Sequence, residues 1–498
     1  MYQITDKHPE YERYQNRWEF YLRSYMGAED YQDGGYLTSY LNESKDEYGR
    51  RIQLTPIDNH CKGIVHIYSS YLWRVPPVRV FGALANNPAL SDFLKDTDLD
   101  GRSFNSFMRE AQQWASVYGH VWIMVDKPQS QVGTRAQELE QGIRPYLTMI
   151  TPENLFDWNY ERSASGRYEL TYLKVRESID RKDDTHTITH FRKWYLDRVE
   201  LWEYDNDNEK LVETVPNMLG KIPAVHLPAN RSNIRGVGIS DIADIAHMQK
   251  AIYEELSEIE QLIRISNHPT LVKTYDTDAS AGAGAVINFP DDMDGNLKPY
   301  MLQPDGGNLD AVRASITDKV ATINRMAHMG AVRGTDAVKA SGIALQTEFQ
   351  LLNSKLSEKA DVLELAEEQV WRLFCLYQEV SPDVEIYYPD SFDVKDYPNE
   401  LQFLQMAKAS GVRSTTLMQE IDKQIADLIL DDEKLARAHV EIEQNTVGLG
   451  DFNKQTQIYK YHIDAGIVSA NEVRDKIGLD DVDGGDELLA PNTGAPNE

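Results

Sequence analysis

The chain has 498 residues and a formal net charge of −29, with 80 acidic residues against 51 basic ones. Its length allows roughly two to four domains with real apolar cores, and its acid surplus excludes the basic footprint on which free-standing nucleic-acid binders depend. The plain alternative is an acidic surface that only aids solubility. The two cysteines, Cys61 and Cys375, exclude a disulfide framework and a cysteine-rich zinc site.

The sequence predicts neither a signal peptide nor a membrane-spanning segment. The N-terminus lacks the basic region and apolar core of a signal peptide. No apolar run of about 18 residues occurs anywhere. We therefore expect a soluble protein made in a cytoplasm.

The first 235 residues predict an α+β domain. Aromatic residues at helical spacing predict a helix over 8–26, and apolar patterns predict further helices over about 56–73 and 104–118. Residues 42–51 between the first two helices are a polar segment. From Gly119 the pattern changes to short β-branched and aromatic runs separated by turns, which predict an antiparallel, meander-like sheet with one solvated face.

The next segment predicts a long helix over 240–267. Its apolar seam follows a repeat close to seven residues and is interrupted by one polar residue, Gln249. Ser240 is a good N-cap and Pro269 ends the segment. The seam consists of Ile242, Ile245, Ile252, Leu256, Ile259 and Ile263.

Turn-rich residues 268–307 contain short strand-like runs and predict a small β excursion between two helices, the second of which covers about 308–328. A third helix, over about 343–377, would be roughly 50 Å long. Between them, residues 329–341 form a short segment with glycines and two cations, Arg333 and Lys339. The segment is either a plain flexible turn or a mobile, locally basic loop on an acidic protein.

The remaining chain predicts a short strand over 384–389, a helical region over 401–445, a final helix pair and an acidic, Gly/Pro-rich tail. No P-loop, dinucleotide fingerprint, nucleophile elbow or zincin motif occurs. We therefore predict no catalytic residue, cofactor or metal, and no enzyme activity.

The order of these parts resembles the portal proteins, or head–tail connectors, of tailed bacteriophages. The N-terminal match is the aromatic helix, then GGYL, EYGRR and a helix that ends before a Pro-Pro element. Each motif is weak alone, and their common order along most of the chain is more specific. The segments that carry the resemblance are 58–78, 238–273, 332–364 and 466–492.

The resemblance implies a mainly helical portal fold of class α+β, with an antiparallel sheet in its wing, a small β/α clip and a helical crown. The implied parts are a wing at 1–239, stem helices at 240–267 and 308–328 with a clip at 268–307 between them, a tunnel loop at 329–341, the wing's long helix and strand at 342–400, a crown at 401–480 and a flexible acidic tail at 481–498.

The resemblance also implies the site residues. The tunnel loop would face DNA with Arg333 and Lys339 and would move about Gly330 and Gly334. A like-charged stem surface would let DNA slide; it would consist of Asp241, Asp244, Glu254, Glu255 and Glu258. The clip would contact an adaptor through Asp276, Asp278, Asp291 and Asp292.

The implied assembly is a homo-oligomeric ring, dodecameric in the virion, at the portal vertex of the capsid. Its implied partners are double-stranded DNA passing through the channel, the terminase large subunit, a head–tail adaptor, and the major capsid and scaffolding proteins. No membrane is involved. Two other classes remain: a cytoplasmic hydrolase with an unrecognised acidic active site, which would be a compact monomer or dimer, and a different structural virion protein.

Overall fold

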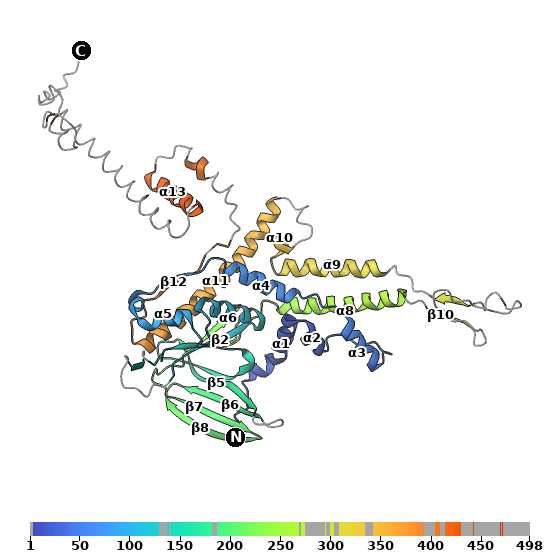
Figure 1. Cartoon of the computed structure of the whole chain (residues 1–498), viewed down its shortest axis with the longest axis horizontal. Helices are drawn as coiled ribbons and strands as arrows, with labels where there is room; N and C mark the ends of the chain where they lie inside the picture. The colour runs from blue at the N-terminus through green and yellow to red at the C-terminus, as the bar shows by residue number, and fades with distance from the viewer. Residues whose placement is uncertain are drawn as a thin grey trace, which may run out of the picture. The chain divides into compact units, whose positions relative to one another are not determined.

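The computed structural model describes residues 3–128, 137–138, 141–181, 187–267, 270–273, 294, 299–302, 308–333, 342–389, 391–392, 404–408, 414–429, 442, 469 and 471. The chain forms two compact units, Met1–Asp393 and Val394–Glu498. The first unit combines helices with antiparallel sheets, so the predicted α+β class is confirmed for it (Figure 1). In the second unit, the longest described element is helix α13 (Thr415–Ile429).

Four helices open the chain: α1 (Pro9–Met26), α2 (Ala28–Asp33), α3 (Lys45–Leu54) and α4 (His60–Leu72). The polar segment at 42–51, for which no helix was predicted, contains most of α3. Ser44 and Glu47 make a reciprocal capping box that satisfies the first amides of α3. The helix predicted from about residue 56 begins at His60, where the Asn59 side chain accepts from the Lys62 amide.

The next elements are the 3₁₀ turn η1 (Gly82–Asn86) and the helices α5 (Pro88–Lys95) and α6 (Phe104–Tyr118). The bounds predicted for α6 are confirmed. Ser103 caps its start by accepting from the Ser106 amide, and Gly119 ends it in the left-handed region with φ of 99°. Glycine adopts this conformation at little cost, which explains the clear stop.

The strand runs form two sheets, so the prediction of one meander was wrong. In the smaller sheet, β2 (His120–Asp126) lies between β3 (Tyr146–Ile150) and β9 (Ala224–Pro228). β2 is buried on both faces, which explains its continuous apolar run. The strand β9 lies within residues 217–236, for which no strand was predicted.

The larger sheet is an antiparallel meander of five strands that follow one another along the chain. Its last strand is exposed along nearly its whole length and was not predicted. The 3₁₀ turn η2 (Pro152–Asn154) separates the two sheets along the chain. The five strands are β4 (Leu155–Arg162), β5 (Tyr168–Arg181), β6 (Thr187–Tyr195), β7 (Arg198–Asp205) and β8 (Asn208–Pro216).

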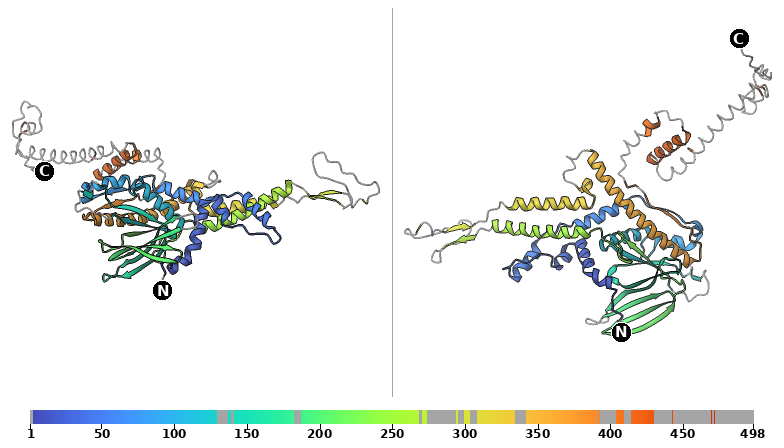
Figure 2. Two further views of the ribbon diagram at one scale, coloured as in Figure 1. Left: turned by 60° about the horizontal axis from the view of Figure 1, so that its bottom comes forward. Right: turned by 180° about the vertical axis from the view of Figure 1, so that it is seen from behind.

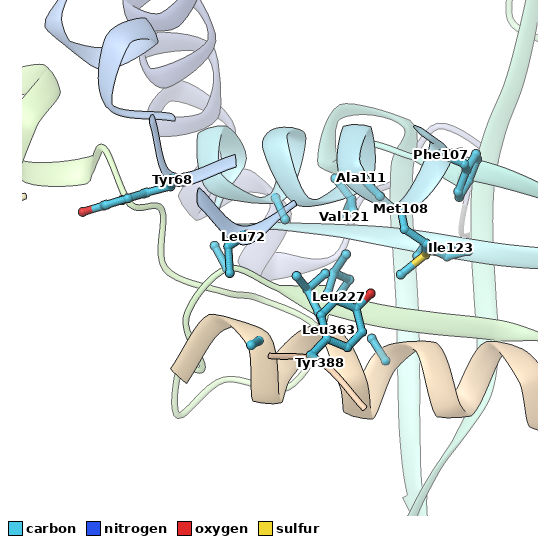
Figure 3. Close-up of a cluster of buried hydrophobic side chains, with 14 of the residues drawn as sticks. Tyr68, Leu72, Phe107, Met108, Ala111, Val121, Ile123, Leu227, Leu363 and Tyr388 are labelled. Carbon is cyan, nitrogen blue, oxygen red and sulfur yellow. The ribbon is translucent and has the colours of Figure 1, made fainter. Parts of the chain in front are cut away.

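The main core lies between the small sheet and the helices (Figure 3). Val121 and Ile123 of β2 and Leu227 of β9 pack with Met108 and Ala111 of α6. The opposite face of β2, with Trp122 and Met124, belongs to a second core shared with the five-stranded sheet and α1. The small sheet is therefore the layer between the helices and the larger sheet.

The predicted long helices are confirmed as α8 (Ala243–Asn267), α9 (Asn308–Met326) and α11 (Gly342–Gln378). α8 and α9 run side by side, and the antiparallel pair β10 (Thr270–Val272) and β11 (Tyr300–Leu302) follows at their far end (Figures 1 and 2). The predicted strand near 384–389 is also confirmed, as β12 (Glu385–Tyr387), which pairs with β1 (Val78–Val80).

Candidate functional site: the α8–α9 pair and the loop at 329–341

The segment before α8 is fixed to the end of α6. A Cβ on Gly119 would lie 2.7 Å from the carbonyl oxygen of Gly238, so the two backbones meet without room for a side chain. The Ser240 hydroxyl donates to the Val117 carbonyl at 2.6 Å and accepts from the Ile242 amide at 3.1 Å. Ser240 therefore caps the turn that leads into α8, and it also positions that turn on α6.

A buried ion pair joins the same segment to α11. The Asp241 carboxylate pairs with the Lys359 ammonium, and both side chains are under 5% exposed. Asn230 donates to the other carboxylate oxygen at 2.9 Å. Burial would raise the pKa of Asp241, but Lys359 and these hydrogen bonds outweigh it and lower that pKa. Burial lowers the pKa of Lys359 even with Asp241 beside it.

Asp241 therefore does not belong to an acidic surface. Lys359 was not predicted as a site residue, although a signal was present: it lies at helical spacing between Leu356 and Leu363, on the buried face of α11. A lysine on such a stripe needs a buried partner, because an unpaired buried charge is costly.

Gln249, the polar break in the α8 seam, joins three helices. Its side-chain oxygen accepts from the Cys61 amide at 2.9 Å, in the first turn of α4. Its side-chain nitrogen donates to the Ser24 carbonyl at 3.0 Å, in the last turn of α1. Both backbone groups lie at helix ends, where amides and carbonyls have no hydrogen-bond partner within their own helix. The seam residues on either side, Ile245 and Ile252, are buried.

The other predicted acids on α8 differ in their surroundings. Asp244 and Glu258 are exposed, whereas Glu254 and Glu255 are half-buried. Glu254 accepts from the amide and hydroxyl of Thr38, at 2.9 and 2.8 Å. Glu258 accepts from the Tyr40 hydroxyl at 2.8 Å. These two acids therefore hold the segment between α2 and α3 against α8.

Glu255 connects the helix pair instead. Its carboxylate pairs with the Lys319 ammonium of α9 at 2.5 Å and accepts from the Ser315 hydroxyl at 2.7 Å. Arg51 is a further cation that was not predicted as a site residue. It is buried and contacts Glu43 and, at 3.0 Å, the Ser257 hydroxyl of α8. The α8 surface is thus acidic but largely engaged by neighbouring elements of the same chain.

The first residues of the glycine-containing loop form a short helix, α10 (Gly330–Arg333). A Cβ on Gly330 would lie 2.3 Å from a carboxylate oxygen of Glu348 on α11, so the helix packs closely there. The Arg333 guanidinium donates to Nδ1 of His60 at 2.9 Å. Nε2 of His60 lies 3.0 Å from the Asp58 carboxylate.

Arg333 is therefore half-buried against α4 in this arrangement. Burial lowers its pKa, and Asp58 partly opposes that effect. The His60 hydrogen bond and the nearby Arg333 charge lower the pKa of Asp58 against the opposing effect of burial. Gly334 and Lys339, as well as the predicted clip acids Asp276, Asp278, Asp291 and Asp292, lie outside the described residues.

The fully buried His120 and the half-buried His226 lie next to the segment that enters α8. The rings of His120 on β2 and His226 on β9 are 5.2 Å apart. His120 accepts from the Gly238 amide at 3.3 Å through Nδ1. Burial lowers the pKa of His226 to about 3, and it lowers the pKa of His120 far below the usual range, with a further contribution from His226. Both imidazoles are therefore neutral at neutral pH.

Within the described ranges, no group of three or more histidine, cysteine, aspartate or glutamate side chains could hold a metal ion. Among the same residues, no helix combines the length and apolar character needed to cross a membrane.

Comparison with known proteins places the chain in context. The family described as phage portal protein, SPP1 Gp6-like, matches residues 6–446. No curated protein matches the chain. A chain from the neck of an empty gene transfer agent (GTA) particle, computed with C6 symmetry, is similar at 11% identity and a TM-score of 0.43, with 77% of this chain and 94% of that chain covered. A chain from the neck of a native GTA particle, computed with C12 symmetry, is similar at 10% identity and a TM-score of 0.41, with 74% and 89% covered.

Proposed function

Because this chain belongs to the SPP1 Gp6-like phage portal proteins, we propose that it forms a ring at one capsid vertex. The ring, dodecameric in the virion, surrounds a channel through which double-stranded DNA enters during packaging and leaves during ejection. The family is one of structural virion proteins, and its match over residues 6–446 is the observation that carries the proposal.

The long helices supply the channel wall in this proposal. α8 and α9 run side by side and are joined by the Glu255–Lys319 pair. We assign them to the stem, the β10–β11 region to the clip, residues 1–239 with 342–400 to the wing, and 401–480 to the crown. The Asp241–Lys359 pair and Gln249 then fix the stem to the wing.

The net negative charge of the protein suits a channel through which DNA passes without binding to the wall. The chain carries a net charge of −29. Phosphate neutralisation by cations supplies most non-specific DNA affinity, so an acidic wall does not retain DNA. On the described part of α8, Asp244 and Glu258 are the exposed members of the proposed acidic surface.

The loop at 329–341 is proposed as the point of closest contact with DNA, through Arg333 and Lys339. Arg333 is held against His60 in the described arrangement. A phosphate contact by Arg333 therefore requires this hydrogen bond to open. Each exposed cation would contribute about 1 kcal/mol or less to a transient contact, which guides DNA without trapping it.

The proposed partners follow from a channel that is used twice. The terminase large subunit docks during packaging, and a head–tail adaptor replaces it, both at the clip with Asp276, Asp278, Asp291 and Asp292. The major capsid and scaffolding proteins are the remaining proposed partners. The chain is made in the host cytoplasm and functions in the virion.

Native mass spectrometry and negative-stain microscopy of the purified protein test this proposal. The expected result is a closed ring with a central hole and a mass that is a multiple of the 56.9 kDa chain. A compact monomer or dimer at every concentration would contradict the proposal and favour the hydrolase alternative. A large assembly without a central channel would favour another structural virion protein.

A further inference from the structure

One stretch of the chain departs sharply from its acidic average. Residues 59–91 contain no aspartate or glutamate, although acids make up about one residue in six overall. The stretch comprises α4, β1, η1 and the start of α5. Much of its exposed surface is either basic or apolar, and the two characters occupy adjacent segments. We call this surface the α4–β1 face and define it by Lys62, His66, Arg109, Val75, Val78 and Val80, together with Tyr387 of the paired strand β12.

The basic part of the α4–β1 face is contributed by two helices. Lys62 and His66 are one turn apart on the exposed side of α4, and Arg109 of the neighbouring α6 is also exposed. Arg109 donates to the Ser69 hydroxyl of α4 at 3.2 Å, which places it beside that helix. Partial burial lowers the pKa of His66, and the nearby Lys62 and Arg109 charges lower it further.

The second part is the outer face of a two-stranded ribbon, which is apolar except for the exposed Glu385 opposite Val80. Val78 of β1 lies opposite Tyr387 of β12, and these side chains are 63% and 53% exposed. Val80 on the same face is also largely exposed. Arg79 and Ile386 alternate with them and point inward, where Arg79 pairs with Glu367 of α11. The ribbon is thus seated on its inner face and uncovered on its outer one.

A second surface has the complementary character. The 37-residue helix α11 is buried along one side, at residues such as Leu352, Leu356, Leu363 and Val370. Steps of three and four residues place another set on the opposite side. We call this set the α11 stripe; its exposed residues are Leu351, Ser354, Glu358, Asp361, Leu365, Gln369, Arg372 and Leu376.

We propose that the α4–β1 face of one copy of this chain packs against the α11 stripe of the next copy. This inference rests on the proposed ring and assigns the contact between its subunits. Lys62, His66 and Arg109 would meet Glu358 and Asp361, and Val78, Val80 and Tyr387 would cover Leu365 and Leu376.

Two observations select a second copy as the partner. Lys62 and Arg109 on one surface and Glu358 and Asp361 on the other have opposite charge and lie on different elements of one chain, so every copy offers both halves of a head-to-tail contact, as a ring requires. The exposed valines and leucines suit a protein surface and have no role in binding phosphate.

Charge reversal in the full-length protein tests the pairing. The variant with Lys62→Glu and Arg109→Glu, and the variant with Glu358→Lys and Asp361→Lys, should each need at least about tenfold more protein for half-assembly, because like charges would face each other. A variant with all four changes should assemble again, because the pairing is restored with its signs exchanged. Sedimentation velocity measures assembly, and circular dichroism with thermal unfolding confirms that each variant is folded.

The matched control is Arg167→Glu with Lys221→Glu, which makes the same charge change at exposed positions away from both surfaces. It should assemble like the unmodified protein. A second measurement does not depend on charge: Val78→Cys on one copy and Leu365→Cys on another, mixed and oxidised, should form a disulfide between copies. Either cysteine variant alone should not do so.

Failure of rescue in the folded four-change variant, or normal assembly of both two-change variants, would overturn the interface while leaving the ring intact. If the unmodified protein itself never associates, the ring proposed above fails as well, and the two results are distinguishable. A loss of double-stranded DNA binding by the Lys62→Glu and Arg109→Glu variant, with unchanged mass, would assign the basic residues to DNA and overturn the proposal.

Discussion

At the residue scale, the Asp241–Lys359 pair is the most consequential connection that sequence inspection did not find. Replacing Lys359 with Met should lower the free energy of unfolding by about 3–5 kcal/mol, because it leaves a buried carboxylate without its partner. Replacing both residues together, with Asp241→Asn and Lys359→Met, should cost less. Denaturant unfolding measures the effect.

The matched control is Arg372→Met on the exposed side of α11, where the Glu368 pair is open to solvent. That change should alter stability by about 1 kcal/mol or less. Equal losses from Lys359→Met and Arg372→Met would mean that the buried pair contributes no more than a surface one.

Acid should weaken the buried pair, because the pKa of Asp241 is lowered by folding: its contribution is present above the unfolded value, about 3.9, and is lost as the pH falls.

His120 and His226 predict a second loss of stability in acid, which begins at a higher pH than the loss through Asp241. An unfolded imidazole has a pKa of about 6.5, whereas burial holds that of His226 at about 3 and that of His120 far below its usual range. The unfolded state therefore takes up protons first, and stability should fall as the pH drops below about 6.5, by about 1.4 kcal/mol per pH unit for each histidine.

His226→Phe should reduce that acid slope by one histidine's share. Denaturant unfolding between pH 7.5 and pH 5 measures the slope, and His247→Gln, on the exposed side of α8, serves as the control. An unchanged slope in His226→Phe would show that this histidine is not the proton acceptor. His120 and His226 could not be identified as a pair from the sequence, because the contact depends on β9 pairing with β2 across about 100 residues.

At the element scale, helices were predicted where local signals decide them. Ser103 and Gly119 mark both ends of α6, and the apolar spacing defines α8 and α11. The arrangement of strands into two sheets was not predicted, because an apolar run in the sequence does not show which other strand it pairs with. The overlooked helix α3 had a capping box, Ser44 with Glu47, whose signal was outweighed by the polar composition of the segment.

Gln249 shows how a break in a pattern can be structural. Leucine at this position would continue the seam, yet Gln249→Leu should destabilise the protein by about 1–3 kcal/mol for each buried backbone group left unpaired. The groups are the Cys61 amide and the Ser24 carbonyl. Gln249→Glu is a useful comparison, since its carboxylate can accept from Cys61 but cannot donate to Ser24.

The contribution of the Gln249 hydrogen bonds can be separated from that of apolar packing in the seam. Thermal or denaturant unfolding compares Gln249→Leu with Ile252→Val, a conservative change in the same seam. Gln249→Leu should be the more destabilising. A gain in stability would mean that burial of the leucine outweighs the loss of both hydrogen bonds, and that the seam was interrupted for another reason.

At the scale of the whole molecule, the site residues divide by how they were inferred. The acids of α8 were selected by sign and helix position, and the structure shows that most of them bind neighbouring elements or, like Asp241, lie buried. Periodicity reports which side of a helix is polar but not what covers it. The Arg333–His60 contact joins positions 273 residues apart in sequence and had no local signal.

The loop at 329–341 carries the prediction that most directly concerns DNA. Replacing Arg333 and Lys339 with Glu should leave ring assembly unchanged and impair packaging or retention of packaged DNA, because a ring of carboxylates would repel the phosphates that pass it. Arg333→Glu also removes the contact with His60, so Lys339→Glu alone separates the charge of the loop from its attachment to α4. His60→Ala, which frees Arg333 without changing its charge, completes the set.

DNA content per particle measures packaging and retention, and sedimentation of the purified rings measures assembly. Unaltered DNA content in the double variant would make the loop a simple connector between α9 and α11, whereas a defect shared by Arg333→Glu and His60→Ala, but absent in Lys339→Glu, would show that its attachment to α4 matters more than its charge.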